Sequence, residues 1–122
     1  MASINKPLII AALIMAFSSS NAFAASKYVT NLTLARVKVQ EGVTLVGTTT
    51  QPANTCSNEG EYFKFDHTTP SGKDLLSLLL AAKASDGVVL SVWYTVSPAP
   101  GTTETTGCDI STISVLNGVG IN

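Results

Sequence analysis

The sequence predicts a mainly β domain with five short strands and one helix, which lies between the third and fourth strands. Residues 71–96 carry a helix signal that runs directly into a strand signal. Segments with apolar residues at every second position recur on both sides, separated by polar, turn-rich stretches. A bend expected in the first strand favours closure of these strands into a small barrel.

Residues 1–24 match a secretory signal peptide, with Lys6 at its start, an apolar run of ten residues, and Ala22-Phe23-Ala24 as the small-x-small cleavage pattern. Cleavage would leave residues 25–122 as one domain with no span long enough to cross a membrane. Without Lys6, six basic residues face eight acidic ones, a formal charge of −2 that argues against nucleic acid as a partner. We expect a secreted or periplasmic protein.

The first strand, residues 27–40, is expected to bend near Ala35-Arg36. Its apolar residues change parity there, so a regular strand could not bury all of them without a bulge. Glu41-Gly42 predicts a tight turn, and residues 43–49 predict the second arm of a hairpin.

Two further strands are predicted, one before the helix and one after the fourth strand. Residues 60–66 predict a third strand with Phe63 and Phe65 facing inward. Residues 109–116 predict the fifth strand, and Asn117-Gly118 predicts a turn after it.

Residues 72–86 predict the helix, with Ser71 as N-cap, Asp74 completing a weak capping box, and Gly87 as the stop. Leu76 and Leu80 widen its apolar arc beyond what a surface helix needs. A loop or a thick core could cover these two side chains, and a subunit interface is the alternative. The centre of the apolar face is formed by Leu75, Leu78, Leu79 and Ala82.

The fourth strand, residues 88–96, alternates between an apolar face that includes Tyr94 and a mixed face that includes Trp93. Cys56 and Cys108 form an even pair in an exported chain, which favours a structural disulfide. Closing a loop of about 50 residues would contribute on the order of 4 kcal/mol.

Catalytic and metal-binding patterns are weak. His67 adjoins Asp66, but neighbours on a strand point to opposite faces, so we interpret His67 as a loop histidine. Glu59 and Glu61 share one face of an extended segment, where we expect a solvated strand edge. No catalytic residue, cofactor or metal site is predicted.

Aromatic side chains with polar tips are the remaining candidates for ligand binding, because sugars and peptides stack on flat rings that also offer a hydrogen-bonding group. We single out Trp93, Tyr94 and Tyr62, with Tyr28 as a further member of the set. For Trp93 a position in the core is marginally favoured, and stacking against a ligand is the alternative.

The helix and fourth strand resemble the B subunits of the pertussis-like and subtilase cytotoxin families. The similarity rests on Lys73, Leu75 and Leu76 at the helix start, on Ser85 and Gly87 at its end, and on Trp93-Tyr94. Small exported bacterial proteins that share the helix end are also similar. The resemblance implies a five-stranded OB-fold barrel, a pentameric ring and binding of cell-surface glycans.

The leading hypothesis is therefore an exported, non-enzymatic binding module with an OB-like barrel, which forms rings and binds glycans. In that arrangement Leu76 and Leu80 would lie at subunit contacts. The alternative is a monomeric periplasmic protein with a structural or inhibitory role toward a protein partner.

Overall fold

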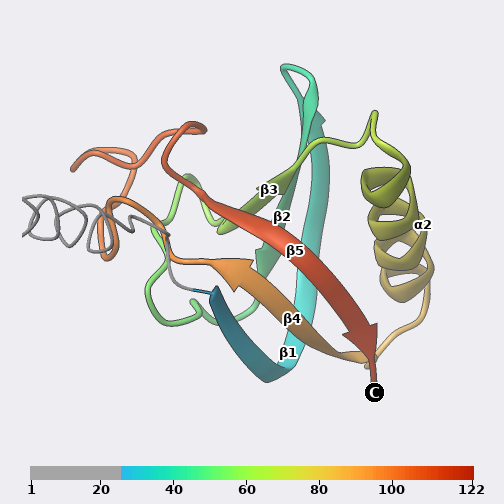
Figure 1. Cartoon of the computed structure of the whole chain (residues 1–122). Helices are drawn as coiled ribbons and strands as arrows, with labels where there is room; N and C mark the ends of the chain where they lie inside the picture. Colours follow the sequence, from blue (N-terminus) through green and yellow to red (C-terminus); the bar gives the residue numbers. More distant parts are fainter. Residues whose placement is uncertain (1–25) are drawn as a thin grey trace, which may run out of the picture.

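The computed structural model describes residues 26–122, which form a closed five-stranded barrel with one helix (Figure 1). The strand order around the barrel is β1-β2-β3-β5-β4, and β4 pairs again with β1. All pairs are antiparallel except β3 with β5. This order and the helix between β3 and β4 confirm the predicted small OB-like barrel. The elements are β1 (Ser26–Gln40), β2 (Val43–Thr48), β3 (Phe63–Phe65), α2 (Pro70–Ala84), β4 (Val89–Thr95) and β5 (Ser114–Ile121).

The signal peptide predicted for residues 1–24 lies outside the described residues. Within the described part, no helix is both long enough and apolar enough to cross a bilayer.

Strand β1 closes the barrel by pairing with two neighbours. Its first part pairs with β4 and its second part with β2. The register shifts between Leu34 and Arg36, which confirms the predicted bulge. A second shift lies between Val29 and Leu32, where Asn31 has a left-handed φ of 62°. Two bulges let one long strand turn from one sheet segment into the next (Figure 1).

Helix α2 begins two residues earlier than predicted. Thr69 is the N-cap, because its hydroxyl accepts the Gly72 N–H at 2.9 Å, and Pro70 occupies the first helical position. Ser71 therefore lies inside the helix and does not cap it. The helix ends at Ala84, with Ser85 as C-cap, before the left-handed Gly87.

The barrel encloses two buried clusters. The main core joins the inward side chains of all five strands to Leu79 and Ala82 of α2, and Phe63 stacks against Tyr94 within it. A smaller cluster holds the disulfide. Its buried members are Leu45, Cys56, Cys108 and Ile113.

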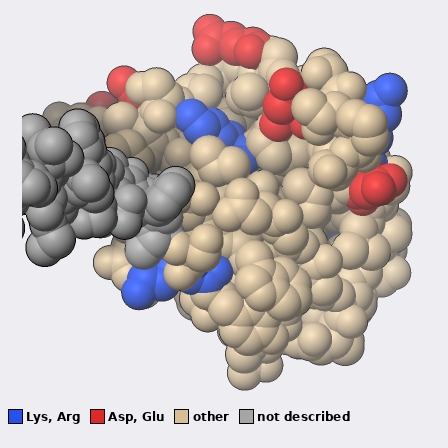
Figure 2. Space-filling view, in the orientation of Figure 1, with Lys and Arg blue, Asp and Glu red and all other residues tan. Residues whose placement is uncertain are grey.

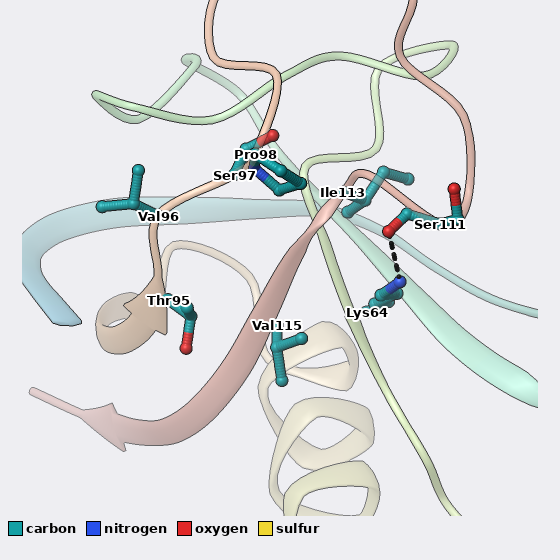
Figure 3. A pocket seen from close by; sticks show the side chains of 8 residues that line it. All are labelled: Lys64, Thr95, Val96, Ser97, Pro98, Ser111, Ile113 and Val115. Carbon is teal, nitrogen blue, oxygen red and sulfur yellow. Dashed lines mark hydrogen bonds between the residues drawn. The ribbon is translucent and has the colours of Figure 1, made fainter. Parts of the chain in front are cut away.

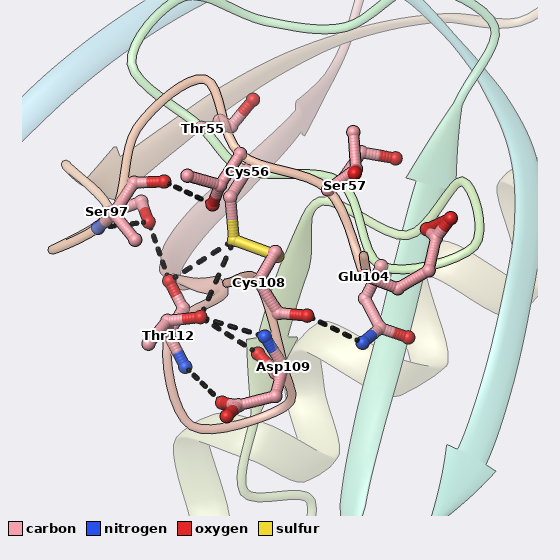
Figure 4. The surroundings of a disulfide bond; sticks show 12 residues. Thr55, Cys56, Ser57, Ser97, Glu104, Cys108, Asp109 and Thr112 are labelled. Carbon is pink, nitrogen blue, oxygen red and sulfur yellow. Dashed lines mark hydrogen bonds between the residues drawn. A yellow bond between two sulfur atoms is a disulfide. The ribbon is translucent and has the colours of Figure 1, made fainter. Parts of the chain in front are cut away.

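The disulfide between Cys56 and Cys108 is confirmed (Figure 4). It joins the loop after β2 to the loop before β5, across a sequence separation of 52. Both cysteines are buried, and the Ser97 hydroxyl donates to the Thr112 carbonyl beside them at 2.6 Å. The bond thus ties two long loops over one end of the barrel.

The predicted position of the fifth strand is wrong. Residues 109–113 form a turn in which one carboxylate oxygen of Asp109 accepts the backbone N–H groups of Ser111 and Thr112. The strand starts only at Ser114. Asn117 is an extra residue in the pairing with β4, so Asn117-Gly118 forms a bulge inside β5, where a turn was expected.

Candidate functional site

Two exposed aromatic side chains meet on the outer face of the barrel. Tyr28 of β1 lies directly opposite Trp93 of β4. Their ring centroids are 4.7 Å apart with a tilt of 41°, and the two residues are 54% and 44% exposed. We call these two rings, with Gly118 and Gly120 of β5, the aromatic platform.

The indole of Trp93 lies against two glycines of β5, Gly118 and Gly120, which have no side chains. A methyl group on Gly118 would lie 3.2 Å from its Cε3 atom, and one on Gly120 would lie 3.7 Å from its Cζ3 atom. The marginally favoured core position of Trp93 is therefore wrong. The alternation along β4 turns Leu90, Val92 and Tyr94 inward and leaves Trp93 outside. Packing against glycine backbone holds the ring while much of it stays in solvent.

Polar side chains border the aromatic platform at both ends, and we call them the polar flank. At one end the Asn117 amide donates to the Thr95 hydroxyl at 3.0 Å. At the other, the Asn122 amide donates to Ser91 at 2.9 Å and to Thr30 at 3.2 Å. The Ser91 hydroxyl in turn donates to Thr30 at 3.1 Å. These bonds position the side chains before any ligand arrives.

The other two predicted ligand-binding residues lie elsewhere. Tyr94 is fully buried in the main core, where its hydroxyl donates to the Ala53 carbonyl at 2.7 Å and burial raises its pKa. It is thus a core residue, inaccessible to a ligand in this structure. Tyr62 is half-buried and packs against the same core. Among the described residues, the ring that pairs with Trp93 is that of Tyr28.

Sequence reasoning placed Tyr28 in the aromatic set but had no reason to join it to Trp93. The two residues are far apart in the chain, and only the register between β1 and β4 brings them together.

The two leucines proposed for a subunit interface have different surroundings. Leu76 is half-buried and packs against the main core, so a core contact covers much of it. Leu80 is 52% exposed on α2.

The arrangement around His67 is structural. Its Nδ1 atom lies 3.0 Å from the Thr44 hydroxyl. Asp66 accepts the N–H and the hydroxyl of Thr68, and these bonds hold the pKa of Asp66 below its usual range. In the described residues, no three His, Cys, Asp or Glu side chains come together as a metal site.

Glu61 was predicted to lie on a solvated strand edge, and this prediction is wrong. Its side chain is fully buried, and its two carboxylate oxygens form ion pairs with Arg36 at 3.0 Å and Lys38 at 3.3 Å. Both cations come from β1. The ion-pair cluster is a structural feature.

A separate groove of about 430 Å³ runs between the end of β4 and the start of β5 (Figure 3). Val96, Ile113 and Val115 contribute to its apolar lining. The ammonium of Lys64 donates to the carbonyls of Ile110 and Ser111 at 2.8 and 3.0 Å. Because its charge is engaged by these carbonyls, Lys64 adds mainly its methylene chain to the groove.

No protein-family model, curated protein or solved structure matches this chain. Among the described residues, the aromatic platform and its polar flank are the features that indicate a function.

Proposed function

We propose that this chain is an exported, non-enzymatic binding module that binds glycans on its aromatic platform. The observation that carries the proposal is the seating of Trp93, which is held against glycine backbone beside Tyr28 and is still 44% exposed. Large exposed aromatic rings with polar neighbours are typical of binding surfaces.

Sugar chemistry fits such a surface. A pyranose ring offers an apolar face of C–H groups for stacking and hydroxyl groups around its rim for hydrogen bonding. The apolar face of the sugar would stack on the aromatic platform, and its hydroxyl groups would form hydrogen bonds with the polar flank. No general base or activated nucleophile is needed for this role.

Export is supported by two features. The first 24 residues match a signal peptide, and the buried disulfide is of the kind that persists in oxidising compartments. We place the mature protein in the periplasm or outside the cell.

Trp93 is the only tryptophan of the chain, so its fluorescence reports on the aromatic platform alone. The mature, oxidised protein is applied to a glycan array, and bound glycans are then titrated while the emission is recorded. We expect saturable binding and a shift in emission. Affinity should fall by about tenfold or more for Tyr28→Ala, measured by fluorescence, and for Trp93→Ala, measured by calorimetry because that variant has no tryptophan.

Val39→Ala is the matched control, because Val39 is an exposed β1 residue outside the aromatic platform. Circular dichroism checks that each variant folds. Trp93→Phe serves as the conservative variant, because it keeps an aromatic ring at the site. An array without hits, or hits that survive both aromatic substitutions in folded protein, would reject the proposal.

We further propose that the module assembles into a homo-oligomer, a pentameric ring in the toxin-like hypothesis. Leu80, exposed on α2, is the apolar side chain that supports this proposal. Light scattering of the mature protein should give a mass near five protomers, and Leu80→Asp should reduce it. A monomeric mass would reject the ring and favour the monomeric alternative with a protein partner. Leu76→Asp is a poorer test because Leu76 also packs against the core.

A further inference from the structure

The aromatic platform and its polar flank contain no charged side chain. Around Trp93, the other outward positions of β4 and the positions paired with them on β1 and β5 are uncharged: Ser26, Tyr28, Ser91, Thr95, Gly118 and Gly120, with Val89 further along β4. In Figure 2 the broad surface over β4 and β5 is accordingly uncharged, with basic atoms at its left margin. A ligand that lies here meets dipoles and rings, with no counter-ion from the platform or its flank.

The cation closest to the platform in sequence is Lys27. It is in register with Tyr94, and so has the opposite parity on β1 from Tyr28. It is therefore not a member of the polar flank.

We infer that the ligand is an uncharged oligosaccharide of at least two sugar rings, which lies across the aromatic platform with an amide at each end. This inference rests on the proposed function and names the class of glycan. Three features of the structure support it.

The first feature is the closeness of the two rings. At 4.7 Å between centroids Tyr28 and Trp93 are in direct contact, so no group can enter between them. An aromatic cage for a quaternary ammonium surrounds the cation with rings, and this pair cannot do so. The ligand must lie on the outer surface of the two rings, which suits a flat, neutral sugar face.

The second feature is the unused hydrogen-bonding capacity of the polar flank. An amide has two donor hydrogens and an oxygen acceptor. In the described structure Asn117 uses one hydrogen, on Thr95, and Asn122 uses its nitrogen on Thr30 and Ser91. The remaining N–H of Asn117 and both amide oxygens can bind hydroxyl groups, which both donate and accept.

The third feature is the distance along β4 between the two ends of the polar flank. The distance from Ser91 to Thr95 along β4 is about 13 Å at roughly 3.3 Å per residue. Asn122 and Asn117 lie at its two ends, with Trp93 between them. One pyranose ring on Trp93 cannot reach both amides, whereas two linked rings can.

The test compares neutral and acidic sugars on one protein. Lactose, cellobiose and chitobiose serve as neutral disaccharides, with their monosaccharides, sialyllactose and sulfated lactose alongside, and the array supplies longer glycans. We expect the best array ligand to be neutral and its affinity to change less than about twofold between 0.05 and 0.5 M salt. A neutral disaccharide unit should bind better than its single sugars.

Variants locate the contacts. Asn117→Ala should weaken binding of that neutral ligand by about fivefold, the loss of one hydrogen bond. Lys27→Ala and the helix variant Ser77→Ala should leave the affinity unchanged.

The outcomes separate the two proposals. Sialylated or sulfated glycans as the preferred ligands, a steep salt dependence, or a loss of affinity in Lys27→Ala would overturn the neutral-ligand inference and leave glycan binding intact. Monosaccharides that bind as well as disaccharides, together with no effect of Asn117→Ala, would overturn the end-to-end arrangement. Absence of any Trp93-dependent glycan binding would overturn the proposed function itself.

Discussion

Replacing Gly72 by alanine tests how α2 docks on the barrel. In an open helix position this change stabilises the helix by up to about 1 kcal/mol, because alanine has the higher propensity. Gly72, however, is buried against the chain that leads into its own helix. A methyl group there would lie 1.8 Å from the carbonyl oxygen of Asp66 and 2.9 Å from the Cα atom of His67.

The contacting atoms belong to backbone, so the clash cannot be relieved by rotating a flexible side chain. Ordinary van der Waals contact begins near 3.4 Å, and the helix start must therefore move by more than an ångström. Overpacking of this kind costs about 1 to 3 kcal/mol. The movement also weakens the Thr69 cap on the Gly72 N–H, a contribution of about 1 kcal/mol. We expect a net destabilisation of about 2 kcal/mol.

Urea unfolding, followed by circular dichroism and by the fluorescence of Trp93, measures this difference. In a domain of this size the melting temperature should fall by roughly 10 °C. Ser77→Ala is the matched control, because Ser77 is exposed on the same helix and its change should be neutral or slightly stabilising. If Gly72→Ala proved as stable as the parent, the close approach of the helix start to Asp66 would be refuted.

Three further predictions concern the disulfide, the buried ion pairs of Glu61 and the hydrogen bonds of Asp109. Replacing both cysteines by serine should lower the free energy of unfolding by about 4 kcal/mol, because the disulfide closes a loop of 52 residues. Reducing the disulfide should have the same effect. A loss of less than about 1 kcal/mol, measured by urea unfolding, would contradict this prediction. Replacing Arg36 and Lys38 together by glutamine should destabilise the protein by about 3 kcal/mol, because the buried carboxylate of Glu61 is left uncompensated. Glu61→Gln should cost less, because the two cations can then turn to solvent. The reverse order of the two losses would refute this account. Hydrogen bonds from Ser111 hold the pKa of Asp109 below its usual range, so its contribution is complete above the ordinary pKa and is lost as pH falls through the lowered value. Asp109→Asn should therefore flatten the decline of melting temperature below about pH 4, and an unchanged acid profile would count against that role.

Local patterns were sufficient for much of the architecture. The parity change in β1 predicted the bulge at Ala35-Arg36. The alternation in β4 separated the inward face with Tyr94 from the face with Trp93, although a core position had been marginally favoured for Trp93. These features depend on neighbours a few residues away, so they can be derived from the sequence. The disulfide prediction needed only the two cysteines and the predicted signal peptide.

Errors arose where local signals compete. Ser71 and Thr69 are both good caps, and the position of Pro70 at the first helical residue decides for Thr69. Asn117-Gly118 is a favoured turn pair, but pairing with β4 on one side extends the strand through it. Glu61 was expected in solvent, because the two cations that compensate its burial come from a different strand.

The sequence by itself determined the order of five strands and one helix, the inward faces of β3 and β4, and the residue types from which a binding surface could be built. Only the tertiary structure decided which aromatic residues form that surface. Trp93 is outside because its inward neighbours fill the core, and it meets Tyr28 and the glycines of β5 through registers between three strands. Such registers are set by the closure of the whole barrel, which no local pattern encodes.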